Sequence, residues 1–288
     1  MGLFTLQASF ARSNSYIILQ ESGPGLLRVS EDGASVTVIA SQVTGLDLTI
    51  DVNGNYVVTT GSELIRVSPS GEVASIAKAP PGSSWVAVSA SRDGSLIVAD
   101  EPSHLLWRIT ENNEIHRLAS YPGSLPLGEN HIGLLVDSSD GCLVMRVSDG
   151  NSPELFRVQL DGRISQVTLS GHVRKPTRMS STPMDTNISI SGGPLIKDGS
   201  GGYLFLDSPW TKNVFRISSV GHVERFAKLP EPAYHGKVLA LNADTKELIV
   251  GGLSRLLRIK ADGTSDVLSS DTRLNHMTAI VLDKGGDQ

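Results

Sequence analysis

The chain has 288 residues and a mass of 30.6 kDa, with 39% hydrophobic residues, 19% charged residues and a formal net charge of -5. This balance excludes the broad basic surface of a nucleic-acid-binding protein, and no apolar run reaches the roughly 18 residues of a membrane-spanning helix. We therefore expect a soluble globular protein with neither nucleic acid nor membrane as a partner.

The single cysteine, Cys142, excludes an intramolecular disulfide and a multi-cysteine zinc site. We expect it to be a small buried residue of a strand. The N-terminus, MGLFTLQASFARSNS, lacks the positively charged start of a signal peptide, which predicts a cytoplasmic protein. A mature secreted chain that begins after an added Met1-Gly2 is the alternative.

A short motif of an apolar residue, an arginine and a β-branched residue recurs six times along the chain. Five residues after each arginine stands a turn residue able to adopt positive φ, and a second β-rich run follows. Each copy therefore predicts a hairpin. The arginines are Arg28, Arg66, Arg108, Arg157, Arg216 and Arg258, and the turn residues are Gly33, Gly71, Asn113, Gly162, Gly221 and Gly263.

A further strand, turn and strand precede each hairpin, which makes four strands per unit. In chain order these segments are residues 45–60, 85–100, 132–147, 193–207 and 237–252. The sixth unit is split, because residues 277–288 supply its first strand and residues 15–41 supply the other three. The arginines lie 38 to 59 residues apart, close to the spacing of propeller blades. We predict an all-β, six-bladed β-propeller in one domain, residues 1–288, closed by the blade that the two termini share.

The repeated arginine is expected to be structural, because six copies at one position of the repeat point to the framework. Such a cation can pair across neighbouring blades or cover apolar surface with its stem.

The repeat, roughly G-x-x-x-D-x-x-G-x-x-x-V-x-D followed by x-R-I-x-x-x-G-x-V, resembles those of NHL propellers, of the gluconolactonase (senescence-marker) group and of the streptogramin lyases. The resemblance covers nearly the whole chain apart from insertions. It implies a propeller of this superfamily and does not select one activity.

In a propeller, the loops that lead into the inner strands and the loops after the second strands open on one face. Three histidines lie before expected inner strands on this face, each beside polar or aromatic neighbours. They are His131 after Glu129 and Asn130, His235 after Tyr234, and His276 after Asn275. The loops after the second strands add Glu21, Asp100, Asp207 and Trp210.

A neutral imidazole can accept a proton near pH 7, and a carboxylate can hold a divalent cation that polarises a carbonyl. The resemblance to streptogramin lyases implies that His235, His276 and Glu21 match the catalytic histidines and the glutamate of magnesium-assisted elimination. The resemblance to the gluconolactonase group implies a divalent metal on the axis, with Glu21 and Asp207 as ligands. We therefore expect Mg²⁺ or Ca²⁺, with no nucleotide cofactor because no P-loop or dinucleotide fingerprint is present.

Two insertions, residues 121–129 and 172–193, lead into inner strands on the same face. Arg174 and Arg178 in the second could pair with a substrate carboxylate or phosphate, and a solvated loop is the alternative.

Together these residues favour a small-molecule enzyme, acting alone as a monomer, that performs lyase-like elimination or ester or lactone opening on a small organic substrate. A natural-product lyase, isomerase or cyclase fits the same site. The alternative is a non-catalytic NHL-type propeller that binds a protein or a ligand.

Overall fold

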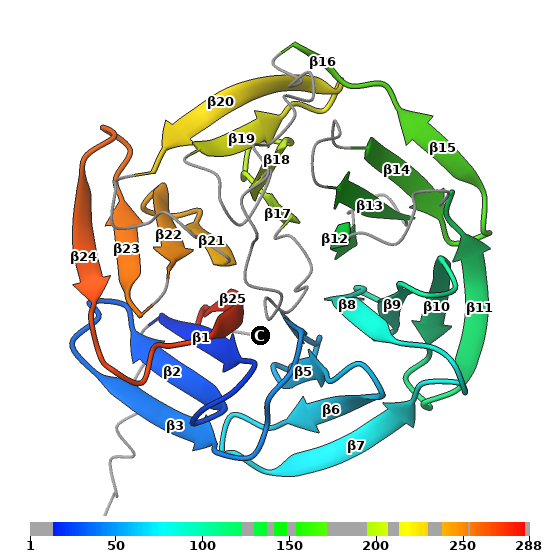
Figure 1. The fold of residues 1–288 in the computed structure, drawn as a ribbon, viewed down its shortest axis with the longest axis horizontal. Helices are drawn as coiled ribbons and strands as arrows, with labels where there is room; N and C mark the ends of the chain where they lie inside the picture. The colour runs from blue at the N-terminus through cyan, green and yellow to red at the C-terminus, as the bar shows by residue number, and fades with distance from the viewer. Residues whose placement is uncertain are drawn as a thin grey trace, which may run out of the picture.

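The computed structural model describes residues 14–122, 130–136, 141–148, 154–171, 195–206, 213–229, 238–252 and 254–285. Within these residues the strands form six sheets arranged as blades around a central axis (Figure 1). The predicted all-β, six-bladed propeller is confirmed. In the same part of the chain, no helix has the length and apolarity needed to cross a membrane.

The first three blades each run from an inner strand at the axis to an outer strand at the rim. Blade 1 is β4 (Asp47–Ile50), β5 (Tyr56–Thr59), β6 (Glu63–Val67) and β7 (Val73–Lys78). Blade 2 is β8 (Trp85–Ala90), β9 (Leu96–Asp100), β10 (Leu105–Ile109) and β11 (Ile115–Ser120). Blade 3 is β12 (Asn130–Val136), β13 (Gly141–Ser148), β14 (Glu154–Gln159) and β15 (Ile164–Val167).

The other three blades follow the same order. Blade 4 is β17 (Leu195–Lys197), β18 (Tyr203–Leu206), β19 (Asn213–Ile217) and β20 (His222–Lys228). Blade 5 is β21 (Val238–Asn242), β22 (Glu247–Gly251), β23 (Leu256–Ile259) and β24 (Ser265–Ser269). Blade 6, the closing blade, is β25 (Met277–Asp283), β1 (Ser15–Gln20), β2 (Leu26–Ser30) and β3 (Val36–Ala40).

The closing blade joins the two ends of the chain as the repeat predicted. Strand β25 pairs antiparallel with β1, from Ser15 opposite Asp283 to Leu19 opposite Ala279. Every residue of β1 is buried, because the strand lies between β25 and β2 within the sheet and between neighbouring blades. This pairing covers the edge of β1 that would otherwise be left without a partner strand.

The turn residue after each repeat arginine adopts positive φ, from +64° to +94°, which confirms the predicted hairpins. Gly33 in the closing blade shows why one of these positions requires glycine. Its φ is +75°, and a Cβ atom there would lie 1.9 Å from the carbonyl oxygen of Leu268. The turn of the closing blade thus packs directly on the backbone of blade 5.

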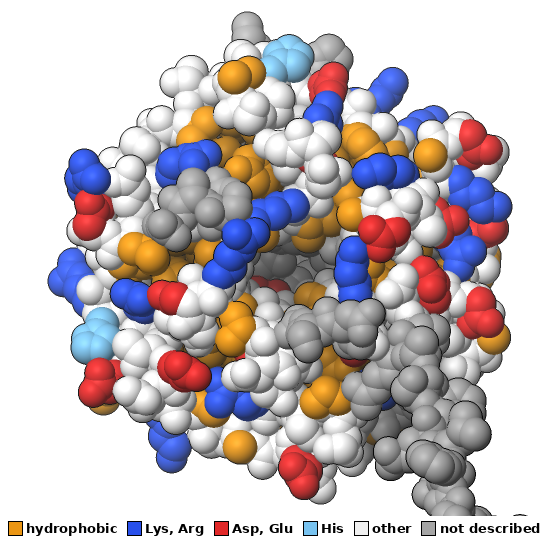
Figure 2. All heavy atoms as spheres, turned by 180° about the vertical axis from the view of Figure 1, so that it is seen from behind, with side chains coloured by type: hydrophobic (Ala, Val, Ile, Leu, Met, Phe, Trp, Pro, Cys, Tyr) orange, Lys and Arg blue, Asp and Glu red, His pale blue; other side chains and the backbone are white. Residues whose placement is uncertain are grey.

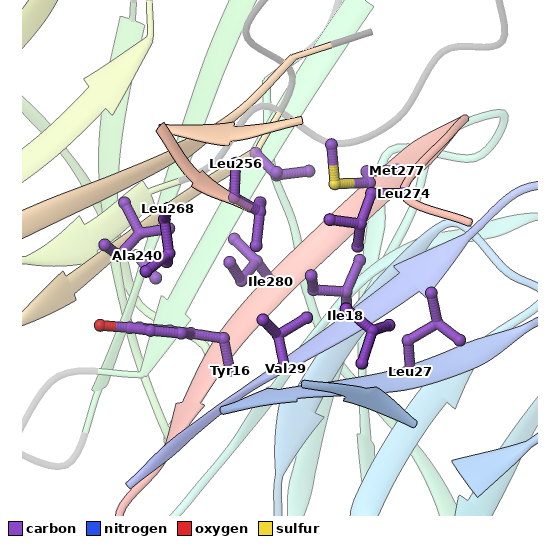
Figure 3. Packing of buried hydrophobic residues seen from close by; sticks show 13 residues of the cluster. Tyr16, Ile18, Leu27, Val29, Ala240, Leu256, Leu268, Leu274, Met277 and Ile280 are labelled. Carbon is purple, nitrogen blue, oxygen red and sulfur yellow. The ribbon is translucent and has the colours of Figure 1, made fainter. Parts of the chain in front are cut away.

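Apolar side chains fill the spaces between neighbouring blades. Each of the six blade pairs around the ring shares one cluster of buried residues in the described part of the chain. Figure 3 shows the cluster between blades 5 and 6, where Leu256 and Leu268 lie opposite Tyr16, Val29 and Ile280. The outer strands are exposed by comparison, as in β7 and β11. The ring is therefore held together by burial between sheets, at roughly 25 cal/mol per Å² of apolar surface.

The repeated arginines are structural, as expected, and their partners differ from blade to blade. In three blades the arginine pairs with an aspartate of the first turn of its own blade, because the third strand ends beside that turn. The pairs are Arg66 with Asp51 at 2.9 Å, Arg108 with Asp93 at 2.6 Å, and Arg216 with Asp198 at 2.5 Å.

Contacts across blades, one of the two structural roles that we expected for these arginines, occur in two described cases. Arg28 donates to the Tyr56 hydroxyl at 2.8 Å, and Arg258 donates to the carbonyl oxygen of Glu31 at 2.7 Å. The Tyr56 hydroxyl in turn donates to Asp283 at 2.6 Å, so it bonds to two strands of the closing blade. Burial raises the pKa of Tyr56 to about 12, which keeps the hydroxyl protonated as a donor.

Two further details complete the fold. Strand β16 (Ser170–Gly171) pairs in parallel with the start of β20 and links blade 3 to blade 4, a contact absent from the repeat pattern. Cys142 on β13 is fully buried, as predicted, and burial raises the pKa of its thiol to about 12.

Candidate functional site

The loops that lead into the inner strands lie on one face of the ring. In Figure 1 the connection from β24 to β25 crosses this face in front of the closing blade. We call the described residues 20–25 and 270–276 the mouth of the closing blade, since these two segments flank the start of β25.

Glu21 and His276 come together in this mouth although they are far apart in sequence. Glu21 follows β1 directly, and His276 directly precedes β25. The backbone N–H of Glu21 donates to the carbonyl oxygen of His276 at 3.0 Å. Both side chains are exposed, so an imidazole and a carboxylate are held on adjoining backbone and are open to a ligand.

A buried amide holds the loop that carries His276. Gln20 is fully buried, and its Nε2 donates to the carbonyl oxygens of Arg273 at 2.6 Å and of Asn275 at 2.5 Å. The same nitrogen lies 3.0 Å from Oδ1 of Asn275. These bonds fix the loop to the end of β1. Sequence reasoning missed Gln20, although a polar residue closing the run SYIILQ gives a weak signal.

The backbone of His276 is strained. Its φ is +47°, a conformation that non-glycine residues adopt rarely and mostly where neighbouring structure imposes it. On the other side of the mouth Gly23 has φ +111°, and a Cβ atom there would lie 3.2 Å from Oδ1 of Asn275. The two segments of the mouth are therefore packed closely together.

An ion pair also stiffens the loop. Arg273 binds the Asp271 carboxylate through Nε at 2.8 Å and Nη2 at 2.6 Å. The Arg273 side chain holds the pKa of Asp271 at about 2, so this carboxylate stays charged and is already occupied. Asp271 supports the loop and is not free to act as a base.

The corresponding face of blade 2 carries an acid and a histidine with a structural role. The Asp100 carboxylate, which we expected at the face, is buried and accepts bonds from the backbone N–H of Ser84 at 2.9 Å and the Ser103 hydroxyl at 2.5 Å. His104, which sequence reasoning did not single out, packs against Tyr121 in a tilted arrangement, with 5.6 Å between ring centroids and 41° between the ring planes. Blade 2 therefore uses these groups to hold its loop.

Below the mouth, the axis contains a cavity of about 140 Å³. All six inner strands line it, mainly with apolar side chains. Leu134, Leu195, Val238 and Ile280 are examples, and the polar side chains are Asp47, Thr49, Ser89 and Thr278. We call this cavity the channel chamber.

Asp47 is the ionisable residue among the described side chains that line the chamber. It is the first residue of β4, and its Oδ2 accepts a hydrogen bond from the backbone N–H of Val88 on β8 at 2.9 Å. Burial raises the pKa of this carboxyl to about 7, against the opposing effect of the bonds from Val88 and Leu48. The sequence gives one signal for it, a charge in the apolar run GLDLTI.

The other predicted site residues divide into two groups. Asn130 and His131 are the first two residues of β12, so they belong to the inner strand and not to the loop in which we placed them; the strand starts earlier because Asn130 pairs with Ser148. The remaining residues lie outside the described part of the chain. They are Glu129, His235, Tyr234, Asp207, Trp210, Arg174 and Arg178.

A divalent metal needs several donor side chains in one place. Within the residues that the structure describes, no three His, Cys, Asp or Glu side chains form a group that could hold a metal ion. In the mouth, Arg273 occupies the Asp271 carboxylate, and the remaining carboxylate, that of Glu21, does not make a metal site by itself. The described residues thus do not fit a metal by themselves, and no chemical step is assigned to one.

No protein-family model and no curated protein matches the sequence. The fold, however, is similar to solved propellers. A streptogramin B lyase has a TM-score of 0.58 at 14% identity, with 95% of this chain and 88% of that chain covered. A putative 6-phosphogluconolactonase from Bacteroides fragilis has a TM-score of 0.60 at 9% identity, covering 96% and 99%.

A third similar structure is regucalcin from Agrobacterium tumefaciens, described as a calcium-binding protein, with a TM-score of 0.53 at 12% identity and coverage of 77% and 72%. These structures with a similar fold include a lyase and a lactonase-type propeller, the kinds of propeller whose repeats this sequence resembles. At such low identities the likeness establishes the fold alone.

Proposed function

We propose that this protein is a small-molecule enzyme whose site lies at the mouth of the closing blade. The observation that carries the proposal is the backbone hydrogen bond of 3.0 Å that sets Glu21 beside His276, with both side chains exposed. An imidazole and a carboxylate on adjoining backbone form a minimal acid–base pair. The strained φ of His276 supports a functional role, because such strain gathers at active sites.

The proposed reaction is elimination or ring opening of a cyclic ester. In the elimination, the His276 imidazole takes the proton from the carbon next to the carbonyl. The electron pair of that C–H bond forms a double bond to the adjacent carbon, the bond between that adjacent carbon and the ester oxygen breaks, and the ester group leaves as a carboxylate. His235 would donate a proton to the departing ester oxygen, and His276 would release its proton to solvent. His131 and Glu129 would be supporting groups, and Arg174 and Arg178 would bind an anionic part of the substrate.

The test is a screen of turnover on lactones and cyclic esters, followed by variants of the mouth. We expect His276→Asn and Glu21→Gln to lower kcat/KM at least 100-fold without lowering the melting temperature, since general acid–base groups contribute about 10²- to 10⁴-fold. Asn is chosen because it tolerates positive φ. His116→Ala is the matched control, since His116 is an exposed histidine on the outer strand β11. Unchanged turnover in His276→Asn would refute the proposed base.

Divalent-metal binding is a separate proposal, supported by the calcium-binding neighbour, with Glu21 and Asp207 as the expected ligands. It is tested by melting the protein with Mg²⁺, Ca²⁺ or EDTA. A ligand of the folded state raises the melting temperature with concentration, and Glu21→Gln should remove that rise. If Mg²⁺ and Ca²⁺ do not raise the melting temperature of the unaltered protein, the metal proposal is refuted. That result would not affect the proposed acid–base pair.

A non-catalytic binding propeller is the second candidate. The channel chamber favours it, because a cavity of about 140 Å³ can hold a small ligand and no residue of the mouth lines it. A protein-docking role has less support. The large exposed hydrophobic residues are spread over the outer strands of several blades, including Val38, Val73, Ile115, Phe226 and Val267. Saturable binding without turnover on any ester would favour this candidate.

A further inference from the structure

The channel chamber contains a carboxyl group that the proposed reaction does not use. Asp47 faces a cavity of about 140 Å³ whose other described walls are hydrophobic side chains and three hydroxyl groups. Part of the Asp47 surface is open to the cavity, although protein surrounds the carboxyl closely enough to desolvate it. The residue is thus placed to meet a ligand inside the channel.

Asp47 lacks a positively charged partner in the described part of the chain. The influences on its carboxyl are burial and the backbone N–H groups of Val88 and Leu48, with no contribution from a charged side chain. An ionised carboxylate offers about four lone-pair positions. The backbone N–H of Val88 donates a hydrogen bond to one of its oxygens, Oδ2 of Asp47. A buried carboxylate without a cation is costly, so a cationic ligand would be favoured here.

The strands that pack against β4 are β5, β8 and β25, and they carry few titratable groups. These groups lie near the end of β4 that is away from Asp47. Tyr56 on β5 pairs with Ile50, at the end of β4 away from Asp47. Asp283, the last residue of β25, accepts a hydrogen bond of 2.6 Å from the Tyr56 hydroxyl. Strand β8, with the sequence WVAVSA, has no ionisable side chain. The negative charge of Asp47 therefore dominates the chamber among the described residues.

We propose that the channel chamber binds a small, mainly apolar molecule that carries a primary ammonium group, and that Asp47 recognises the ammonium. A cavity of about 150 Å³ with apolar walls binds benzene, which sets the size of the apolar part at about one six-membered ring. An ammonium has three donors. One would reach Asp47, and the hydroxyl groups of Thr49, Ser89 and Thr278 are the other acceptors among the chamber walls.

The charge distribution favours entry from the mouth face. Figure 2, seen from the side opposite to Figure 1, shows the axis hollowed, with Lys and Arg side chains around the opening. Like charges there would repel an ammonium. On the mouth face, Arg273 is already paired with Asp271, and the exposed Glu21 beside His276 would attract an ammonium. The inference goes beyond the proposed function, because it requires no catalysis at His276.

The experiment is calorimetric titration of the full chain with cyclohexylamine, and with cyclohexanol as the neutral probe of the same size. At pH 8 the amine is protonated and the Asp47 carboxyl is mostly ionised. We expect saturable binding of cyclohexylamine, at least tenfold weaker in Asp47→Asn, while cyclohexanol binds weakly and equally to both proteins. Asp266→Asn, an exposed aspartate on β24, is the matched control and should bind like the unaltered chain.

Two further variants separate this inference from the proposed enzyme. Glu21→Gln and His276→Asn should retain cyclohexylamine binding within about threefold even if they abolish turnover. The inference is overturned if cyclohexylamine shows no saturable binding, if Asp47→Asn binds it as tightly as the unaltered chain, or if the Glu21 variant alone loses it. A melting curve of Asp47→Asn verifies that any loss of binding occurs in a folded protein.

Discussion

Glu21 in the mouth and Asp47 in the channel chamber lie beside the starts of neighbouring inner strands, β25 and β4, yet their carboxyl groups have opposite environments. At the start of β25, the exposed Glu21 and His276 meet through backbone atoms of two loops. At the start of β4, Asp47 points among hydrophobic side chains, and burial raises its pKa to about 7. The position of a residue in the propeller repeat thus sets where its side chain lies, and the side chains around it set its pKa.

The two regions are connected through the closing blade. The backbone N–H of Gly45 donates to the carbonyl oxygen of Gln20 at 3.1 Å, and the Thr278 hydroxyl donates to the carbonyl oxygen of Gly45 at 2.8 Å. A short path of hydrogen bonds therefore runs from the buried amide of the mouth to the segment that precedes Asp47. Measurements of the free energy of unfolding can therefore test how far the mouth and the chamber depend on one another.

The largest effect is expected from Asp47→Asn. Between pH 4 and pH 7 the folded protein binds more protons than the unfolded chain at this site, because its pKa is about 7 in the fold against 3.8 for a free carboxyl. Stability should therefore fall as the pH rises through this window, by at most about 4 kcal/mol at roughly 1.4 kcal/mol per pH unit. The variant, which has no charge to bury, should be the more stable protein at pH 8.

Urea unfolding at pH 4.5 and pH 8 measures this difference. We expect the gain of Asp47→Asn over the unaltered chain to grow with pH, while the exposed control Asp266→Asn shows no such growth. An equal difference at both pH values would show that the chamber does not desolvate the carboxyl.

The next effect concerns the mouth. Gln20→Leu removes the buried amide and leaves the carbonyl oxygens of Arg273 and Asn275 without their donor. Unpaired buried acceptors cost about 1–3 kcal/mol, and this loss should not vary with pH. The measurement is urea unfolding, with amide hydrogen exchange at Glu21 as a local probe. Gln166→Leu, at an exposed position of β15, should change stability by less than about 0.5 kcal/mol.

The smallest effect is expected at the connection between the regions. Thr278→Val keeps the shape of a buried side chain but removes the donor to Gly45, at a cost of about 1 kcal/mol. Thr37→Val on the exposed part of β3 is the control. If the path matters, Thr278→Val combined with Gln20→Leu should cost less than the sum of the two single changes, because both weaken the same contact. Full additivity would mean that the mouth and the chamber are independent.

Much of the fold could be predicted because its signal is local and repeated. The arginine followed five residues later by a positive-φ turn marks each outer hairpin, and all six turn residues have the expected conformation. The split sixth unit predicted the pairing of β25 with β1. The partners of the arginines could not be read in this way, because a motif gives the position of a side chain along its strand and not the direction in which it reaches.

The site was predicted less completely. The meeting of Glu21 with His276 followed from the closed ring, and the structure shows their backbones in contact. Gln20 and Asp47 were missed, since each is a single polar residue in or beside an apolar run and looks like an ordinary strand residue. Their roles depend on what surrounds them in three dimensions.

The number of blades, the closure through the termini, the turn conformations and the burial of Cys142 could all be predicted from the residue pattern alone. These features depend on the periodicity of the backbone and on which side chains avoid water, and both can be recognised from the order of the residues. The folded ring was needed to show which arginine pairs with which acid, that Gln20 fixes the mouth, and that Asp47 faces a mainly apolar chamber. Charge, desolvation and hydrogen-bond partners depend on residues from other blades, and those become neighbours only when the ring closes.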